Sequence, residues 1–77
     1  IDVMRGCDAI VEKKGLTPRE SEIVRLLARG RNAPYIQEKL VLSRNTVKTH
    51  VANIYAKVGV HSQQELIDAV EANALDD

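Results

Sequence analysis

Two stretches with helical periodicity lie only three residues apart, and this spacing constrains the fold more than any other feature of the chain. Asn32 is a suitable N-cap for the first stretch, and Pro34 fits its first turn. The second stretch covers residues 44–58 and follows Ser43, a second N-cap residue. Because residues 41–43 are too few for anything but a tight bend, the two helices are predicted to pack in a helix-turn-helix geometry.

The helix predicted over residues 44–58 has an apolar side and an opposite side without a single carboxylate. At about 100° per residue, the apolar stripe consists of Val47, Val51, Ile54 and Val58. The outward side consists of Asn45, Thr49, Ala52 and Ala56, with Lys48 on one shoulder and Thr46, Asn53 and Lys57 on the other. Its small central side chains allow close approach, and its lysines supply positive charge. This pattern favours a helix that lies in a DNA groove, with an ordinary solvated surface as the alternative.

A second strong helix start lies earlier in the chain. Thr17 and Glu20 have the spacing of a capping box, in which each side chain bonds the backbone N–H of the other. Pro18 occupies the first helical position, where its missing N–H costs nothing. We expect this helix to end near Arg29, with Gly30 closing it in a left-handed conformation.

Both ends of the chain predict a further helix. A short lead-in helix ends at Gly15 and either packs on the domain or continues a linker. Gly59 ends the long helix, and Ser62 with Glu65 predicts a second capping box. The apolar positions of the last helix are Leu66, Ile67, Ala69 and Val70. These positions either belong to the core of one chain or form a dimer seam.

The length of 77 residues suits one small domain. Hydrophobic residues make up 44% and aromatic residues 3% of the chain, so the core must consist of Leu, Ile, Val and Ala, which suits packed helices. Strand-like alternation is absent. We therefore predict an all-α fold, in which residues 1–15 form the lead-in helix or linker and residues 16–77 form a four-helix domain.

The formal net charge of zero conceals an uneven distribution of charge. Residues 31–57 hold five basic residues and one acidic residue, or +4, whereas residues 58–77 hold five acidic residues and no basic one, or −5. Charges are screened over about 8 Å at physiological salt. A basic middle can therefore attract phosphate while the acidic tail lies on another side, and a nucleic-acid partner is not excluded.

Candidates for catalysis or metal binding are few. The single cysteine, Cys7, excludes an internal disulfide and a CxxC metal pair, and its place on an apolar side predicts a buried, inert thiol. His50 and His61 have no carboxylate or thiol at ligand spacing. For His50 a phosphate contact and a packing role remain open. Without a nucleophile and base pair or a phosphate-cradling glycine loop, we predict no enzyme, cofactor or metal.

Three segments together resemble the DNA-binding domain of the LuxR (GerE-like) family of bacterial transcription regulators. They are LTPRESEIVRLLARG at residues 16–30, LSRNTVKTHVANIYAKVGV at residues 42–60 and SQQELI at residues 62–67. The resemblance covers residues 16 to about 72. It implies a four-helix fold whose third helix enters the major groove, whose first two helices brace the DNA backbone, and whose fourth helix commonly forms a two-fold dimer interface.

By position, the resemblance assigns roles to individual residues. The implied base-reading residues are Asn45, Lys48, Thr49, Ala52 and Asn53. The implied phosphate-contacting residues are Thr17, Arg31, Thr46 and Lys57. The implied dimerisation residues are Leu66, Ile67, Ala69 and Val70. These side chains have suitable chemistry, because lysine donates to guanine, asparagine pairs with adenine, and the methyl groups of threonine and alanine pack on thymine.

Two residues depart from the family pattern. Gln37 stands where members usually carry a small alanine, so its side chain must extend to solvent or form a hydrogen bond. Tyr35 belongs to a NAPY segment that replaces more usual polar or charged residues, and it predicts a contact peculiar to this subgroup. The crossing of the two helices of the motif is expected to depend on Gln37.

We therefore predict a sequence-specific domain for double-stranded DNA, acting as the C-terminal output domain of a transcription regulator and as a homodimer on an inverted repeat. Further expected partners are RNA polymerase and an N-terminal sensor or receiver domain outside this sequence. The expected compartment is the cytoplasm, although an N-terminal region would decide whether the whole protein is tethered to a membrane. The alternative is a helical interaction module that docks a protein on its last helix, and salt dependence distinguishes the two.

Overall fold

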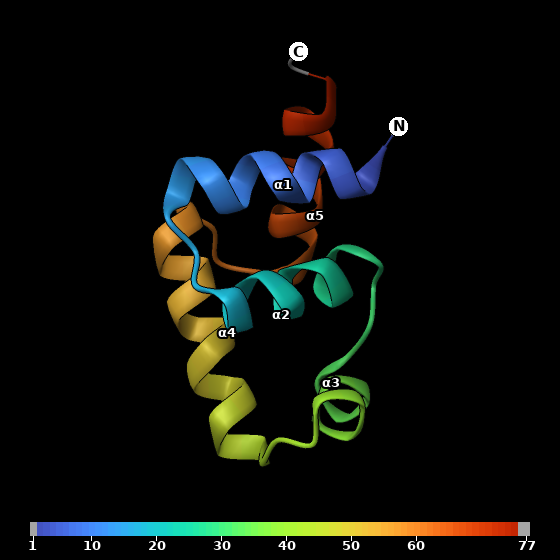
Figure 1. Cartoon of the computed structure of the whole chain (residues 1–77), viewed down its shortest axis with the longest axis vertical. Coiled ribbons are helices and arrows are strands. Elements are labelled where there is room, and N and C mark those ends of the chain that lie inside the picture. The colour runs from blue at the N-terminus through green and yellow to red at the C-terminus, as the bar shows by residue number, and fades with distance from the viewer. Residues whose placement is uncertain (1, 76–77) are drawn as a thin grey trace.

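Residues 2–75, the part of the chain that the computed structural model describes, form helices joined by short connections and contain no strand. The helices are α1 (Val3–Lys14), α2 (Pro18–Ala28), α3 (Ala33–Leu40), α4 (Arg44–Val58) and α5 (Gln63–Leu75). Helix α4 runs along the long axis of the molecule, with α3 beside its N-terminal end and with α1 and α5 toward the other end (Figure 1). The predicted all-α fold is confirmed.

The predicted caps of α2, α3 and α4 are present. Thr17 Oγ1 accepts a hydrogen bond from the Glu20 N–H at 3.1 Å, and Glu20 Oε1 accepts one from the Thr17 N–H at 2.9 Å. The side chains of Asn32 and Ser43 each accept from the backbone N–H three residues later, at 2.9 Å and 3.2 Å. These bonds satisfy N–H groups that have no partner within the helix, so the helices begin where local sequence predicts.

The start of α5 differs in one bond from the predicted capping box. Ser62 Oγ accepts a hydrogen bond from the Glu65 N–H at 3.2 Å, as expected. Glu65 Oε1, however, accepts from the N–H of His61 at 3.1 Å. The chain bends at residues 61 and 62, and this bend brings the N–H of His61 to the carboxylate. The prediction that Glu65 returns a bond to the cap residue itself was therefore wrong.

The turn between α3 and α4 contains a strained residue that sequence reasoning missed. Val41 has φ 54° and ψ 55°, in the left-handed region that a β-branched residue rarely adopts. The residue is 88% exposed, and the next residue, Leu42, donates its N–H to the carbonyl of Gln37 at 2.9 Å. These features end α3 abruptly and place Ser43 where it can cap α4.

One hydrophobic core joins all five described helices. It consists of Cys7, Ile10, Leu16, Ile23, Val24, Leu26, Leu27, Ala28, Ile36, Val47, Ile54, Leu66 and Val70. Helix α1 contributes Cys7 and Ile10 to this core, so the lead-in helix packs on the domain. Burial raises the pKa of the Cys7 thiol, which keeps it protonated and unreactive near neutral pH. The predicted buried thiol is confirmed.

Candidate nucleic-acid interface

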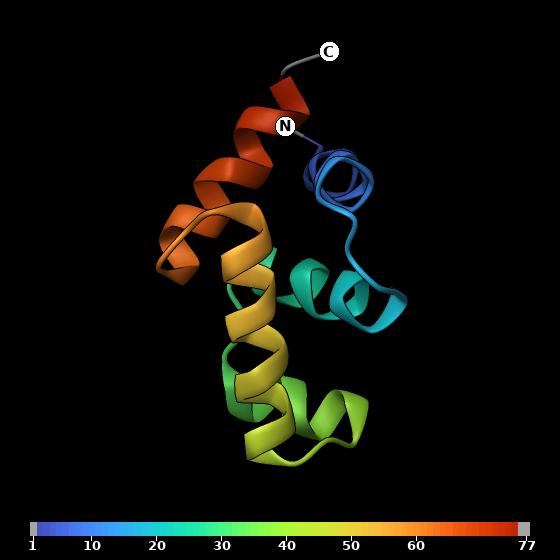
Figure 2. The ribbon, with the colours of Figure 1, turned by 90° about the vertical axis from the view of Figure 1, so that its left-hand side faces the viewer.

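The face of α4 opposite the core is open to solvent. Val47 and Ile54 are fully buried, which fixes the rotation of the helix about its axis. The residues predicted to read bases are all exposed, and they are Asn45, Lys48, Thr49, Ala52 and Asn53. In the view of Figure 2, α4 stands in front of α2 and α3 and no other helix covers it. This face can therefore approach another molecule without rearrangement of the chain.

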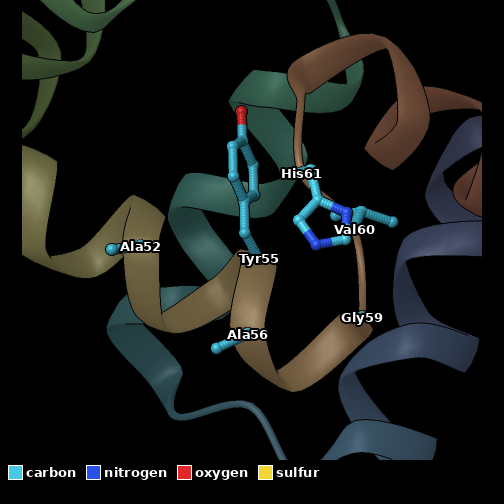
Figure 3. Close-up of a pocket in the computed structure, with 6 residues that line it drawn as sticks. All are labelled: Ala52, Tyr55, Ala56, Gly59, Val60 and His61. Atoms are coloured by element: carbon cyan, nitrogen blue, oxygen red, sulfur yellow. The ribbon is translucent and has the colours of Figure 1, made fainter.

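Hollows of different chemistry lie along the exposed face of α4, among them two with distinct linings. The first is lined by Asn45, Thr46, Thr49 and His50, which lie near the N-terminal end of the helix. The second is lined by Ala52, Tyr55, Ala56, Gly59, Val60 and His61, and Figure 3 shows the two small alanines on its α4 side. The small side chains leave room for close approach along the helix. His50 is half-buried, which permits both the phosphate contact and the packing role that the sequence left open.

The exposed Arg31 is held in place by two neighbours that sequence spacing did not suggest. Its guanidinium carbon lies 4.6 Å from the centroid of the Tyr35 ring, within the range of a cation–π contact. The side chain of Gln63 donates to the carbonyl oxygen of Arg31 at 2.9 Å and to that of Leu27 at 3.1 Å. Tyr35 and Gln63 therefore order the segment that leads into α3.

The other predicted phosphate contacts have different environments. Thr17 is exposed, although its hydroxyl already accepts the capping bond from the Glu20 N–H. Thr46 is half-buried and its hydroxyl accepts from the Ser43 hydroxyl at 2.8 Å. Gln37 is also half-buried, and none of its side-chain polar atoms is both buried and unpartnered. This environment agrees with the expectation that the Gln37 amide finds solvent or a partner.

Lys57, one of the predicted phosphate contacts, has a partner within the protein. Its Nζ donates to Oε1 of Glu20 at 2.7 Å, and Glu20 is only 4% exposed. The hydrogen bond from Lys57 is the main reason that the pKa of the Glu20 carboxyl lies below its ordinary value, with the Thr17 N–H contributing next. The Lys57 side chain is 37% exposed, so Lys57 is bound to Glu20 on one side and open to solvent on the other.

The predicted dimerisation residues on α5 divide into two groups. Leu66 is 0% and Val70 1% exposed, so both belong to the core of a single chain. Helix α1 packs across α5 and its Gly6 lies against the backbone of Val70. Within a single chain these two side chains are therefore not accessible to a partner. Ile67 and Ala69 are half-buried, and the exposed positions of α5 are Gln64, Glu65, Asp68, Ala72 and Leu75.

Basic residues of the segment 31–57 lie mostly toward one end of the molecule. All five basic residues of the middle segment are exposed, and they are Arg31, Lys39, Arg44, Lys48 and Lys57. Lys39, Arg44 and Lys48 lie on α3 and in the first half of α4, at the end of the long axis away from the C-terminal end of α5 (Figure 1), whereas Lys57 lies in the last turn of α4. The long axis measures 36 Å, several times the screening length of about 8 Å. The acidic Asp76 and Asp77 lie outside the described residues.

The tight connection between α3 and α4 and the exposed polar face of α4 define a helix-turn-helix domain. Residues 14–70 match the GerE family model, described as bacterial regulatory proteins of the luxR family. The chain belongs to this family, which confirms the resemblance in the three sequence segments. The family comprises regulatory proteins rather than enzymes, and this domain is of the kind that binds DNA in transcription regulation.

Several curated relatives share the same region. The Fimbriae Z protein of Escherichia coli K12 is 49% identical over 53 residues, which cover 69% of this chain and 25% of the relative. The uncharacterized response regulatory protein YgeK of the same strain is 54% identical over 52 residues, covering 68% of this chain and 35% of the relative. The transcriptional activator protein BglJ, also from that strain, is 34% identical over 62 residues, which cover 80% of this chain and 28% of the relative.

The matched stretches thus span 25% to 35% of these three relatives. No solved structure matched the chain significantly. Within residues 2–75, no helix combines the length and the apolar character needed to cross a bilayer.

Proposed function

We propose that this domain binds specific sequences of double-stranded DNA with α4 in the major groove. The observation that carries this proposal is the exposed, carboxylate-free face of α4, which stands opposite the buried Val47 and Ile54. The major groove of B-DNA is about 12 Å wide and admits an α-helix. In this placement Lys48 donates to guanine, Asn45 and Asn53 face adenines, and Thr49 and Ala52 pack on thymine methyl groups.

Contacts to the DNA backbone would fix the register of α4 without reading sequence. Arg31 is suited to this role because it is exposed and already ordered by Tyr35. Thr17 is the N-cap of α2, and Thr46 lies in the first turn of α4. Backbone N–H groups at both helix starts favour an anion. We leave Lys57 out of this set because its ammonium forms an ion pair with Glu20.

We further propose that the domain works as a pair on an inverted repeat, as the DNA-binding output part of a larger cytoplasmic regulator. Membership of the luxR family supports this proposal, as do curated relatives much longer than the matched stretch. A two-fold arrangement would use the open side of α5, around Asp68 and Ala72, together with the half-buried Ile67 and Ala69. A contact with RNA polymerase and the nature of any sensor or receiver domain stay predictions.

The test starts with selection of bound fragments from a random DNA pool, followed by affinity measurements on the selected duplex and on a scrambled one. The Lys48→Ala variant should weaken binding to the selected duplex by about 1 to 3 kcal/mol, because it removes a base contact. Lys39→Ala is the matched control. It removes the same charge from the exposed side of α3 and should affect both duplexes alike.

Two results would contradict the proposal. If Lys48→Ala preserved the ratio of affinities for the selected and scrambled duplexes, Lys48 would not read bases. If the selection enriched no sequence and added salt left the affinity unchanged, the domain would not be a DNA reader. The rival function, docking of a protein on α5, would then account better for the chain.

A further inference from the structure

A single carboxylate oxygen connects the first turn of α2 with the last turn of α4. Glu20 Oε1 accepts the Thr17 N–H at 2.9 Å and the Lys57 ammonium at 2.7 Å. Glu20 is 4% exposed, whereas the Lys57 side chain is 37% exposed because its stem lies on the surface of α4. The two residues are 37 positions apart in the chain. This contact therefore fixes one helix relative to another.

Helix α4 needs such a contact because few of its residues are buried. Of its 15 residues only Val47 and Ile54 are fully buried. Hydrophobic burial is non-directional, so it resists separation of α4 from the core better than it resists a tilt of the helix. A hydrogen-bonded ion pair restricts both distance and angle. The pair therefore adds a directional contact to the apolar packing of α4, to which the half-buried Val51, Tyr55 and Val58 also contribute.

A small tilt of α4 would matter for base reading. Lys48 and Lys57 are nine residues apart, which corresponds to about 13.5 Å along a helix. A tilt of about 5° at the Lys57 end therefore moves the Lys48 backbone by about 1 Å. Hydrogen bonds weaken over a few tenths of an ångström, so a shift of this size is enough to misalign contacts with base edges.

We infer that Glu20 and Lys57 are positioning residues for DNA reading: their ion pair fixes the orientation of α4, and Lys57 does not hold a phosphate. This inference rests on the proposed function. Lys57 acts through the helix on Lys48 and its neighbours, and Glu20 acts through Lys57. Release of Lys57 would remove from the Glu20 carboxylate a charged donor at 2.7 Å and leave it the Thr17 N–H, which favours the closed pair.

Glu20→Gln separates this role from a phosphate contact by the sign of its effect. Glutamine has nearly the same size and still accepts the Thr17 N–H in a capping box, so α2 keeps its start. Only the charge that holds Lys57 is lost. If Lys57 were a phosphate ligand held back by Glu20, the variant would bind all DNA more tightly. If the pair positions α4, the variant binds the selected duplex less tightly.

The experiment measures affinities for the selected and scrambled duplexes over a salt series, with the parent chain, Glu20→Gln, Lys57→Met and the double variant. We expect each single variant to lose about five- to tenfold in affinity for the selected duplex, the scale of one misaligned base contact. Affinity for the scrambled duplex should stay within about twofold, with an unchanged salt slope, since no phosphate contact is lost. The double variant should be no worse than the singles.

Glu22→Gln is the matched control. Glu22 lies two residues further along α2, is exposed, and pairs with Arg19 at 2.9 Å on the surface. This variant makes the same change of charge without touching α4, so both affinities should equal those of the parent. Lys57→Arg is expected to retain the parent's preference between the duplexes because it keeps the ion pair.

Two outcomes would overturn the inference. The first is a Glu20→Gln variant that binds both duplexes more tightly, with a steeper salt dependence. The second is a Lys57→Met variant that loses affinity equally for both duplexes, with a salt slope reduced by about 0.9, the value for one phosphate. The second outcome depends only on Lys57→Met, so it can be measured even if Glu20→Gln does not fold. If the parent itself prefers no sequence, the proposed function fails and the inference falls with it.

Discussion

Glu20 takes part in helix capping and in tertiary packing at the same time. Its carboxylate completes the cap of α2 with Thr17 and pairs with Lys57 of α4. Both contacts favour the charged form, and together they hold the pKa of this carboxyl below its ordinary value of 4.5 although burial opposes them. The sequence predicts the first contact and not the second, because capping is local and the partner of Lys57 is not.

The lowered pKa of Glu20 predicts an acid-dependent loss of stability. A carboxyl with a lower pKa in the folded state contributes stability above its unfolded pKa, near 4.5, and loses it as the pH falls through the folded pKa. Urea unfolding of the parent between about pH 7 and pH 3 should therefore show a steeper decline than that of Glu20→Gln. Glu22→Gln should behave like the parent. Equal pH dependence of the parent and Glu20→Gln would contradict the prediction.

At the scale of helices, the packing of α1 on α5 depends on a glycine inside a helix. A Cβ atom at Gly6 would overlap the carbonyl oxygen of Val70 and lie 2.9 Å from its Cγ1. The glycine therefore permits close approach of the two helices. This approach buries Val70, one of the residues that the family resemblance assigns to a dimer interface.

The Gly6→Ala variant should therefore destabilise the domain, although alanine favours a helix more than glycine does. The helix preference gains at most about 1 kcal/mol, whereas forcing α1 away from α5 costs about 1 to 3 kcal/mol and loosens the packing around Val70. Thermal unfolding of the variant and the parent measures the net change in stability. Glu12→Ala, at an exposed position of the same helix, should change the stability by less than about 0.5 kcal/mol. A Gly6→Ala variant more stable than the parent would show that α1 does not pack closely on α5.

At the scale of the whole molecule, the burial of Leu66 and Val70 predicts a weak dimer. The exposed positions of α5 are the polar Gln64, Glu65 and Asp68 and the apolar Ala72 and Leu75, so the apolar surface for association without DNA is small and interrupted by charge. We expect sedimentation to find single chains in solution and two chains on an inverted repeat. Ala72→Arg should prevent the second chain from binding while leaving a single half-site occupied, because like charges would face each other across a two-fold axis.

Glu12→Arg adds the same side chain on α1 and serves as the control for that change in charge. It should leave the assembly with two chains intact. A stable dimer of the parent without DNA, unaffected by Ala72→Arg, would show that association uses another surface. Two chains on an inverted repeat after Ala72→Arg would show the same for the bound state.

The sequence by itself determined the helices and the character of α4. Caps such as Thr17, Asn32 and Ser43 bond to backbone only three residues away, so their residue types suffice to place the helix starts. The two faces of α4 follow in the same way from helical spacing. The luxR membership rests on these local segments.

Tertiary structure alone decided the partner of Lys57, the contacts of Gln63 with Leu27 and Arg31, and the burial of Leu66 and Val70. The first two join residues 32 to 37 positions apart. A long cationic side chain fits a phosphate and a carboxylate equally well, and an apolar stripe fits a core and a dimer seam equally well. Only the packing of α1, α2, α4 and α5 selects among these partners, because it sets which groups come within reach.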